Sequence, residues 1–343
     1  MKGEPVLRIR TATLALLLCL IGMGSQSARG QSLEGNKDFN KGARTSLQFL
    51  KIGIGARQAA LGEASIALVR DVNSVYWNPA STAGIENLEV GFNYTRWLAD
   101  LNYVAGSVGY RLGTFGIITG FVASLDYGEI PEALVSGGAS ANDPRTGNTF
   151  SGSDLLAGIS FTREFTDRLA IGITAKYIRE SLFTFSGSTF AWDVGTNYNI
   201  GFKGIRLAMA AQNFGGSVSY LDEGSESEGF DVPIIFRIGL SMDVVSPNGN
   251  ALVAMGPGHE VRFALEAINS NDYSERLHVG GEYSFNDFLM VRGGYRVNYE
   301  EGNLAFGFGL APRLSGMEVR IDYAYVGYEF LTAPHRFTMT LAF

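Results

Sequence analysis

Residue types that could carry chemistry are sparse in this chain and lie far apart. The three histidines, His259, His278 and His335, fall on separate segments without the spacing of metal ligands. The run Gly53-Ile54-Gly55 begins like a dinucleotide fingerprint but lacks the third glycine, and the chain has neither a G-x-S-x-G nor an H-E-x-x-H motif. We therefore expect a protein that is not an enzyme and that binds no cofactor or metal through these residues.

The charged residues of the C-terminal part follow a regular pattern. From residue 260 onward, nearly every charge falls on the strand face that also carries glycine and alanine. Opposite signs recur on neighbouring segments, which favours a network of internal ion pairs over the alternative, a site for a polar substrate. The residues concerned are Arg262, Glu266, Arg276, Glu282, Arg292, Arg296, Glu318, Arg320, Asp322 and Arg336.

A second concentration of charge is the acidic segment 221–231. Its carboxylates repel one another, so the segment is expected to be an extended, solvated loop. The alternative is a site for calcium or for a cargo protein, because carboxylate oxygens suit a hard cation. The polar segment 129–153 is an equally unspecific loop. The carboxylates of the acidic segment are Asp222, Glu223, Glu226, Glu228 and Asp231.

The elements that position these charges are predicted by apolar and polar residues that alternate with period two. Fourteen such segments follow one another from residue 88, and most have the 9 to 11 or so residues that a tilted membrane strand needs. They are 88–98, 101–112, 114–128, 154–165, 169–182, 189–200, 205–214, 234–245, 260–269, 276–285, 288–299, 303–312, 317–329 and 335–343. The apolar face of the last segment carries Phe337, Met339, Leu341 and Phe343.

The placement of the charges decides between two kinds of β protein. A soluble sandwich or a lipocalin-like barrel also alternates, but its packed interior would not hold so many charges. A barrel that faces lipid must hide them in its lumen. We therefore predict an all-β protein, with a fourteen-stranded antiparallel transmembrane β-barrel over residues 88–343.

The connections fit a barrel whose two chain ends are periplasmic. Short turns near 111–113, 166–168 and 286–287 then face the periplasm. The long segments 129–153 and 215–233 face outward. The segment 246–258 is a long link on the periplasmic side, and the pattern offers no reason for it.

The first thirty residues are predicted to be a secretory signal peptide. Arg8 and Arg10 precede a short apolar run, and small residues near Ala28 suit a cleavage site. Cleavage removes the only cysteine, Cys19, and with it disulfides and thiolate chemistry. It also leaves 23 of the 27 basic and 33 of the 34 acidic residues, and the resulting net charge of −10 argues against a nucleic-acid partner.

Residues 31–87 do not alternate and are expected to fill the barrel. About eight strands already enclose a lumen that side chains can fill, so fourteen strands need an additional plug. The stretch DVNSVYWNPASTAG, residues 71–84, reads as a short helix capped by Asp71 and ended by Asn78-Pro79. We predict that this helix is part of a lumenal plug.

One stretch resembles a known family. GARQAALGEASIALVRDVNSVYWNPASTAG, followed by WLADLNY, is similar to the N-terminal signature of the PorV/PorQ family, which belongs with the FadL-like outer-membrane barrels. Arg70 stands where the family usually has a second acidic residue, and Ser81 where it often has glycine. The residues that match the family motif are Asp71, Ser74, Tyr76, Asn78, Pro79 and Ala80.

The resemblance implies two possible functions in the outer membrane. PorV-like members are non-enzymatic components of type IX secretion and surface attachment, with the translocon and secreted cargo proteins as partners. FadL-like members pass hydrophobic small molecules, in some through a kink in the wall; the glycines of strand 114–128 suit either such a kink or ordinary tight packing. The alternating C-terminus that ends in Phe343 resembles the signal read by the barrel-assembly machinery.

Overall fold

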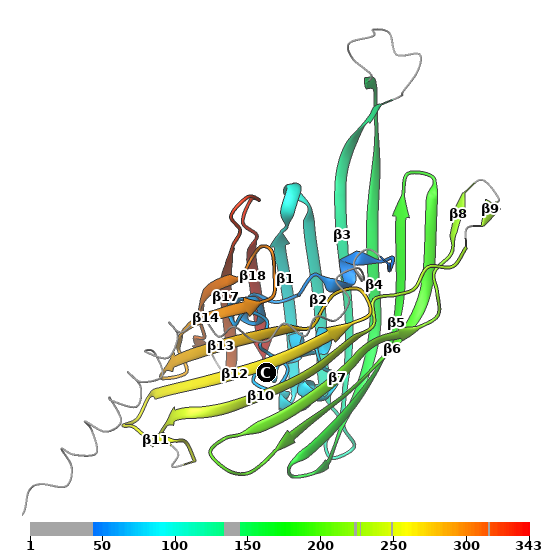
Figure 1. The fold of residues 1–343 in the computed structure, drawn as a ribbon. Coiled ribbons are helices and arrows are strands. Elements are labelled where there is room, and N and C mark those ends of the chain that lie inside the picture. The colour runs from blue at the N-terminus through cyan, green and yellow to red at the C-terminus, as the bar shows by residue number, and fades with distance from the viewer. Residues whose placement is uncertain (1–43, 134–144, 223–224, 227, 248–249, 315) are drawn as a thin grey trace, which may run out of the picture. The chain divides into compact units, whose positions relative to one another are not determined.

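Fourteen long strands form one closed antiparallel barrel, which confirms the predicted fold class (Figure 1). The computed structural model describes residues 44–133, 145–222, 225–226, 228–247, 250–314 and 316–343. Each wall strand pairs with the next one along the chain, and β1 closes the ring by pairing with β18. The wall strands are β1 Leu88–Arg96, β2 Asn102–Arg111, β3 Ile117–Ala133, β4 Arg145–Thr166, β5 Leu169–Leu182, β6 Phe185–Asn199, β7 Arg206–Gly215, β10 Ile235–Ser246, β12 His259–Ser270, β13 Arg276–Phe285, β14 Leu289–Val297, β15 Leu304–Leu310, β17 Met317–Gly327 and β18 His335–Ala342.

The outward face of the wall is apolar, as a surface in contact with lipid requires. Phe92, Ile159 and Phe306 are each half-exposed or more, whereas their chain neighbours face inward and are buried or only partly exposed. On β18 the outward positions include Phe337 and Met339. Recognition of this terminal strand by the barrel-assembly machinery remains a prediction.

The two ends of the barrel differ in their connections. At the turn end, β4 and β5 are joined by residues 167–168 and β13 and β14 by residues 286–288, and both Leu88 and Phe343 lie there. At the loop end, the β3–β4 hairpin extends well beyond the other strands (Figure 1). Because outer-membrane barrels have short periplasmic turns and longer extracellular loops, the turn end is the periplasmic one.

Two segments predicted as loops contain strand. Within 129–153, β3 continues to Ala133 and β4 begins at Arg145, with an irregularity in pairing near Gly128. Alternation does not mark these residues because water surrounds both faces of a hairpin that leaves the bilayer. Within 246–258, β11 (Val253–Ala254) pairs in parallel with the end of β10. The remaining short strands are β8 Tyr220–Asp222, β9 Ser225–Glu226 and β16 Arg313–Leu314.

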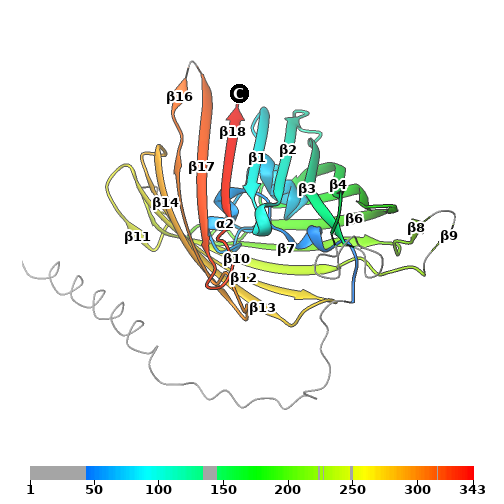
Figure 2. The same cartoon turned by 90° about the horizontal axis from the view of Figure 1, so that it is seen from above.

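The segment before the wall contains short helical turns inside the ring of strands (Figure 2). The predicted helix at 71–84 is two 3-10 helices. Asn78 has extended backbone angles because the following Pro79 disfavours a helical conformation there, so the first helix stops and a second one starts. The helices among the described residues are η2 Gln48–Lys51, α2 Ala56–Ala60, η3 Val72–Tyr76, η4 Pro79–Gly84 and η5 Leu98–Asp100.

The predicted signal peptide, residues 1–30, lies outside the described residues, as does part of the acidic segment 221–231. Where the chain is described, no helix combines the length and the apolar character that a bilayer crossing demands.

Candidate functional site

The interior of the barrel is occupied by residues 44–87, which we name the plug segment. Its start is held at the loop end by Asp272, between β12 and β13. The backbone N–H groups of Arg44 and Thr45 donate to Asp272 Oδ1 over 2.9 and 3.3 Å, and Lys51 forms an ion pair with Oδ2. Burial raises the pKa of Asp272, but these donors outweigh burial and hold the pKa below its usual value.

The motif residues Asp71 and Ser74 organise the first turn of η3. The Asp71 carboxylate accepts from the Asn73 backbone N–H over 3.0 Å, and the Ser74 hydroxyl accepts from the Asp71 N–H over 3.2 Å, which forms a capping box. Asp71 also lies 3.6 Å from a nitrogen of Arg57 and 3.4 Å from one of Arg320. One carboxylate therefore shapes the turn and joins it to the wall.

Tyr76 and Asn78 connect the plug segment to wall backbone. The Tyr76 hydroxyl lies near two carbonyls, 2.7 Å from that of Gly106 on β2 and 3.0 Å from that of Val122 on β3. The Asn78 amide donates to the Thr196 carbonyl of β6 over 3.1 Å, and its oxygen caps η4.

Pro79 and Ala80 pack against strands that carry glycine at the contact. The Pro79 carbonyl accepts from the Thr162 hydroxyl of β4 over 2.7 Å. A Cβ at Gly172 of β5 would lie 2.6 Å from Ala80 N, and one at Gly195 of β6 would lie 1.9 Å from the Asn78 side-chain oxygen. Larger residues at these two glycines would push η4 away from the wall.

Glu282 of β13 is the centre of one ion cluster in the lumen. Its two carboxylate oxygens accept from the Arg57 guanidinium, each over 2.9 Å. Arg292 contacts Glu282 over 2.6 Å and Asp322 over 2.6 Å, and Arg262 contacts Glu282 over 3.2 Å. The cluster unites four wall strands, β12, β13, β14 and β17, with α2 of the plug segment, and Glu282 is almost fully buried within it.

A second cluster is centred on a carboxylate of the plug segment itself. Glu63 lies 3.2 Å from Arg296 of β14 and 3.9 Å from Arg336 of β18. Burial raises the pKa of Glu63, but nearby positive charge, with Arg296 first, more than offsets burial and lowers the pKa to about 2. Glu63 is therefore ionised at neutral pH.

Glu266 and Arg276, two further residues of the predicted network, have different partners. Arg237 of β10 contacts Glu266 of β12 over 2.8 Å and covers the ring of Trp77 at 4.8 Å. Arg276 is not part of either cluster: its guanidinium lies between the rings of Tyr273 and Tyr299, at 3.9 and 4.0 Å. The expectation of a carboxylate near Arg276 is not met among the described residues, because these two tyrosines flank it.

Several interior residues were not recognised from the sequence, notably Arg57, Glu63, Arg237 and Asp272. Arg57 and Glu63 stand in a small-residue stretch that does not alternate, so periodicity could not assign them to a face. Their only signal is the presence of charge among alanines and glycines, which is costly unless the charge is paired.

The cavity at the turn end is polar. It has a volume of about 710 Å3 and is lined by charges of both signs, from the plug segment and from the wall. Arg57, Asp71 and Arg320 link this cavity to the Glu282 cluster. The charged residues that line it are Arg57, Arg70, Asp71, Glu86, Glu89, Arg206, Asp243, Glu260, Arg262, Arg313, Glu318 and Arg320.

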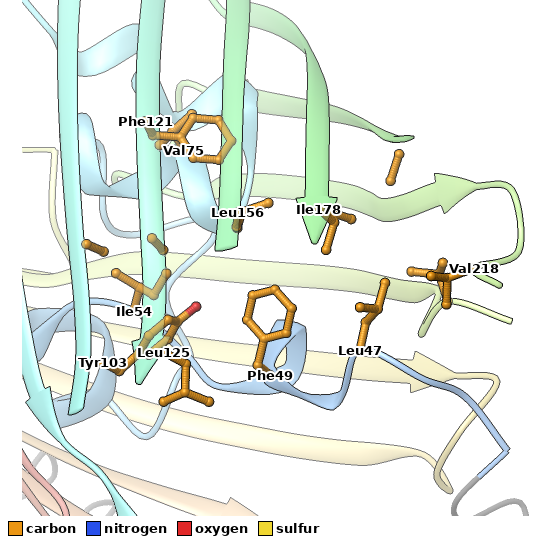
Figure 3. Packing of buried hydrophobic residues seen from close by; sticks show 14 residues of the cluster. Leu47, Phe49, Ile54, Val75, Tyr103, Phe121, Leu125, Leu156, Ile178 and Val218 are labelled. Atoms are coloured by element: carbon orange, nitrogen blue, oxygen red, sulfur yellow. The ribbon is translucent and has the colours of Figure 1, made fainter. Parts of the chain in front are cut away.

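An apolar cluster lies in the interior toward the loop end (Figure 3). Leu47 and Phe49 of the plug segment lie among inward-facing side chains that include Leu125, Leu156 and Ile178. A pocket of about 30 Å3 adjoins this cluster on the side of Trp77 and Arg237. At this cluster the plug segment packs against the side chains of the wall.

Candidate metal ligands are dispersed in the described part of the chain. Among these residues there is no group of three histidine, cysteine or acidic side chains placed to hold a metal ion. His259, His278 and His335 each lie within 2.9 Å of a tyrosine hydroxyl and remain on three separate strands. What the interior geometry does is fasten the plug segment to the wall.

Comparison with known proteins places this geometry in a family. Residues 36–260 match the family described as "Type IX secretion system protein PorV". The chain belongs to the PorV family. This match confirms the resemblance carried by the motif from Asp71 to Ala80, and the outer membrane as the location that the family and fold support. No curated protein matches the chain.

Solved structures support the fold of this PorV family member. The Pseudomonas putida toluene transporter TodX aligns with a TM-score of 0.56 and 12% identity, and the Ralstonia pickettii toluene transporter TbuX with 0.53 and 13%. Each alignment covers 84% of this chain and 97% of the other. At this identity the likeness shows that the barrel fold is shared with these proteins and shows nothing finer.

Proposed function

We propose that this chain is a non-enzymatic component of type IX protein secretion and surface attachment in the outer membrane. Membership of the PorV family supports this role. The structural observation that carries it is the ionic attachment of the plug segment, through Arg57, Glu63 and Asp71, to the wall strands β13, β14 and β17. Because its lumen is held closed, such a barrel is suited to bind partner proteins and not to pass them through the lumen.

The energetics of the two ion clusters support a fixed plug. Moving the plug segment out of the lumen would separate Arg57 from Glu282 and Glu63 from Arg296, and would leave buried charges without partners. Breaking one buried pair typically costs about 3–5 kcal/mol. An exported protein would also need a path far wider than the small spaces between the plug segment and the wall. In this proposal, translocon and cargo contact the outside of the barrel or its loop end.

The alternative function is a channel for hydrophobic small molecules. The apolar cluster around Phe49 and Leu156 favours it, as does the likeness of fold to proteins named toluene transporters. An apolar molecule that passed this cluster would next meet the charges of Glu63, Arg296 and Arg336. Dehydration of such charges by an apolar ligand is unfavourable, so we rank this function second.

Affinity purification from gently solubilised outer membranes tests the proposal. The tagged chain is isolated, and co-purifying proteins and lipids are identified by mass spectrometry, with an equally tagged, unrelated fourteen-stranded barrel as the control. We expect a large translocon barrel and secreted proteins that share a C-terminal sorting domain, both absent from the control. Recovery of the chain alone with bound fatty acid or hydrocarbon would favour the alternative.

A further inference from the structure

The outward faces of β5 and β6 change from apolar to polar at a shared height. On β5, the outward positions include Ile173 and Tyr177, and the next outward residue toward the loop end is Arg179. On β6, Phe190 is 68% exposed, and the next outward residue toward the loop end is Ser188. The strand register pairs Tyr177 with Phe190 and Arg179 with Ser188, so both strands leave the hydrocarbon at the same level.

This transition has the form of a membrane interface. The Tyr177 and Phe190 rings are in contact, with centroids 5.4 Å apart, and Trp192 lies one outward position further from the loop end. Aromatic side chains concentrate where the apolar band of a barrel ends. Since the turn end is periplasmic, Arg179 lies at the level of the headgroups of the outer leaflet.

A polar groove of about 450 Å3 opens at this level. One side is formed by β5 and β6, and the other by residues 217–221, which lead into β8. The two sides come close because Gly187 has no side chain: a Cβ there would lie 2.8 Å from Val218 Cγ2. The groove is lined by Tyr177, Arg179, Ser186, Gly187, Ser188, Ser217, Ser219 and Leu221.

The lining offers one cation and several hydroxyls. Within the described part of the chain, no carboxylate forms an ion pair with Arg179, and its neighbour Glu180 faces inward, where it accepts from Tyr220. A guanidinium with free N–H groups binds phosphate oxygens in a bidentate manner. Serine hydroxyls both donate and accept, as recognition of sugar hydroxyls requires.

We propose that this groove binds the phosphorylated sugar headgroup of a glycolipid in the outer leaflet. Arg179 contacts a phosphate, Ser188 and Ser217 contact sugar hydroxyls, and the acyl chains run along the apolar faces below Tyr177 and Phe190. Arg179 would bind the phosphate of a lipid and free phosphate through the same contacts. The position of the groove directly above a lipid-facing aromatic pair argues for the lipid. The site goes beyond the proposed role in secretion and does not depend on it.

The test is lipid binding to the mature chain in phosphatidylcholine nanodiscs that contain a small fraction of diphosphoryl, hexa-acylated lipid A. Retained lipid A is counted by native mass spectrometry. We expect Arg179→Gln to reduce the occupancy at least about fivefold, and Ser188→Ala together with Ser217→Ala to reduce it about twofold to threefold. The matched control is Arg163→Gln, because Arg163 is also an exposed arginine of the wall but lies beside Phe165 near the turn end.

Three results would overturn the proposal. Equal occupancy in the Arg179→Gln and Arg163→Gln variants would remove Arg179 from the site. Displacement of lipid A by millimolar inorganic phosphate would identify a free-phosphate site instead. Retention of phosphatidylglycerol as strong as that of lipid A would show attraction to charge without recognition of sugar. Heat-modifiable electrophoretic mobility of each variant separates lost binding from lost folding.

Discussion

Glu282 contacts three arginines, more than any other carboxylate described in the lumen. We therefore predict that substitution of Glu282 lowers stability more than substitution of any other charged residue there. Glu282→Gln keeps the size of the side chain but leaves Arg57, Arg292 and Arg262 with one negative charge fewer. We expect the free energy of unfolding to fall by about 3–5 kcal/mol, because removal of one partner leaves buried charge uncompensated. Urea unfolding in detergent micelles, followed by tryptophan fluorescence, measures the change.

The matched control for this substitution is Glu164→Gln at the turn end. The Glu164 side chain is 43% exposed and contacts Arg111 over 2.9 Å. Exposed ion pairs contribute little, so we expect a change within about 1 kcal/mol. A Glu282→Gln variant as stable as the Glu164→Gln variant would contradict the assigned importance of the Glu282 cluster.

The ionisation of Glu63 is expected to make the free energy of unfolding depend on pH. Its pKa in the folded chain is about 2, below the ordinary value of 4.5, so its contribution is fully present above pH 4.5 and is lost as the pH falls from 4.5 toward 2. The shift corresponds to about 3 kcal/mol at most. We expect the unfolding free energy of Glu63→Gln to fall less steeply over this interval than that of the unsubstituted chain. Parallel pH curves would show that Glu63 is not held ionised by Arg296.

At the scale of the element, the position of η4 depends on glycine in the wall. Gly195→Ala places a methyl group where the Asn78 side-chain oxygen lies, 1.9 Å from the ideal Cβ position. We expect the turn to shift and the stability to fall by about 1–3 kcal/mol, as overpacking usually costs. Trypsin should then cleave the plug segment faster, at Arg57 or Arg70.

The control for this shift is Gly120→Ala on β3. A Cβ at Gly120 points outward and meets nothing within 4 Å. We expect its digestion rate to equal that of the unsubstituted chain. If Gly195→Ala resists trypsin equally well, close packing of η4 against β6 does not hold the plug segment in place.

The sequence allowed the wall to be predicted because a barrel strand in lipid is a local, one-dimensional pattern. Phe337 and Met339 alternate with Arg336 and Thr338, and each residue reveals its own face. The plug segment has no such periodicity, and many of its contacts with the wall join residues far apart in the sequence, 225 positions in the case of Arg57 and Glu282. Alternation placed charges such as Arg292 in the lumen, but it could not say that Glu63 or Arg57 would neutralise them.

The extension of β3 and β4 shows the same limit in another form. Beyond the bilayer both faces of a hairpin are wetted, so neither face needs to be apolar and alternation disappears. The irregular pairing near Gly128 marks the place where the hairpin leaves the regular ladder. The predicted strand bounds were thus reliable inside the bilayer, where lipid imposes alternation. Outside the bilayer, where both faces meet water, the predicted strands were too short.

At the scale of the whole barrel, the roles of holder and channel make opposite demands on the plug segment. A channel must displace it, whereas a holder of cargo works with the lumen closed. Ala67 of the plug segment and Gly239 of β10 allow this difference to be tested, because the Ala67 Cβ lies 3.6 Å from the ideal Cβ position at Gly239. This separation falls within the range of about 3.5–4.5 Å found in disulfides, although the Ile66 side chain has to shift.

The Ala67→Cys, Gly239→Cys double variant therefore tethers the plug segment to the wall when oxidised and releases it when reduced. The only natural cysteine, Cys19, lies in the predicted signal peptide, so no other thiol is expected to compete. We expect cells that carry the oxidised variant to display cargo on their surface as well as cells treated with a reductant, because a holder does not need an open lumen. Loss of surface cargo under oxidising conditions alone, restored by reduction, would mean that the plug segment moves during export.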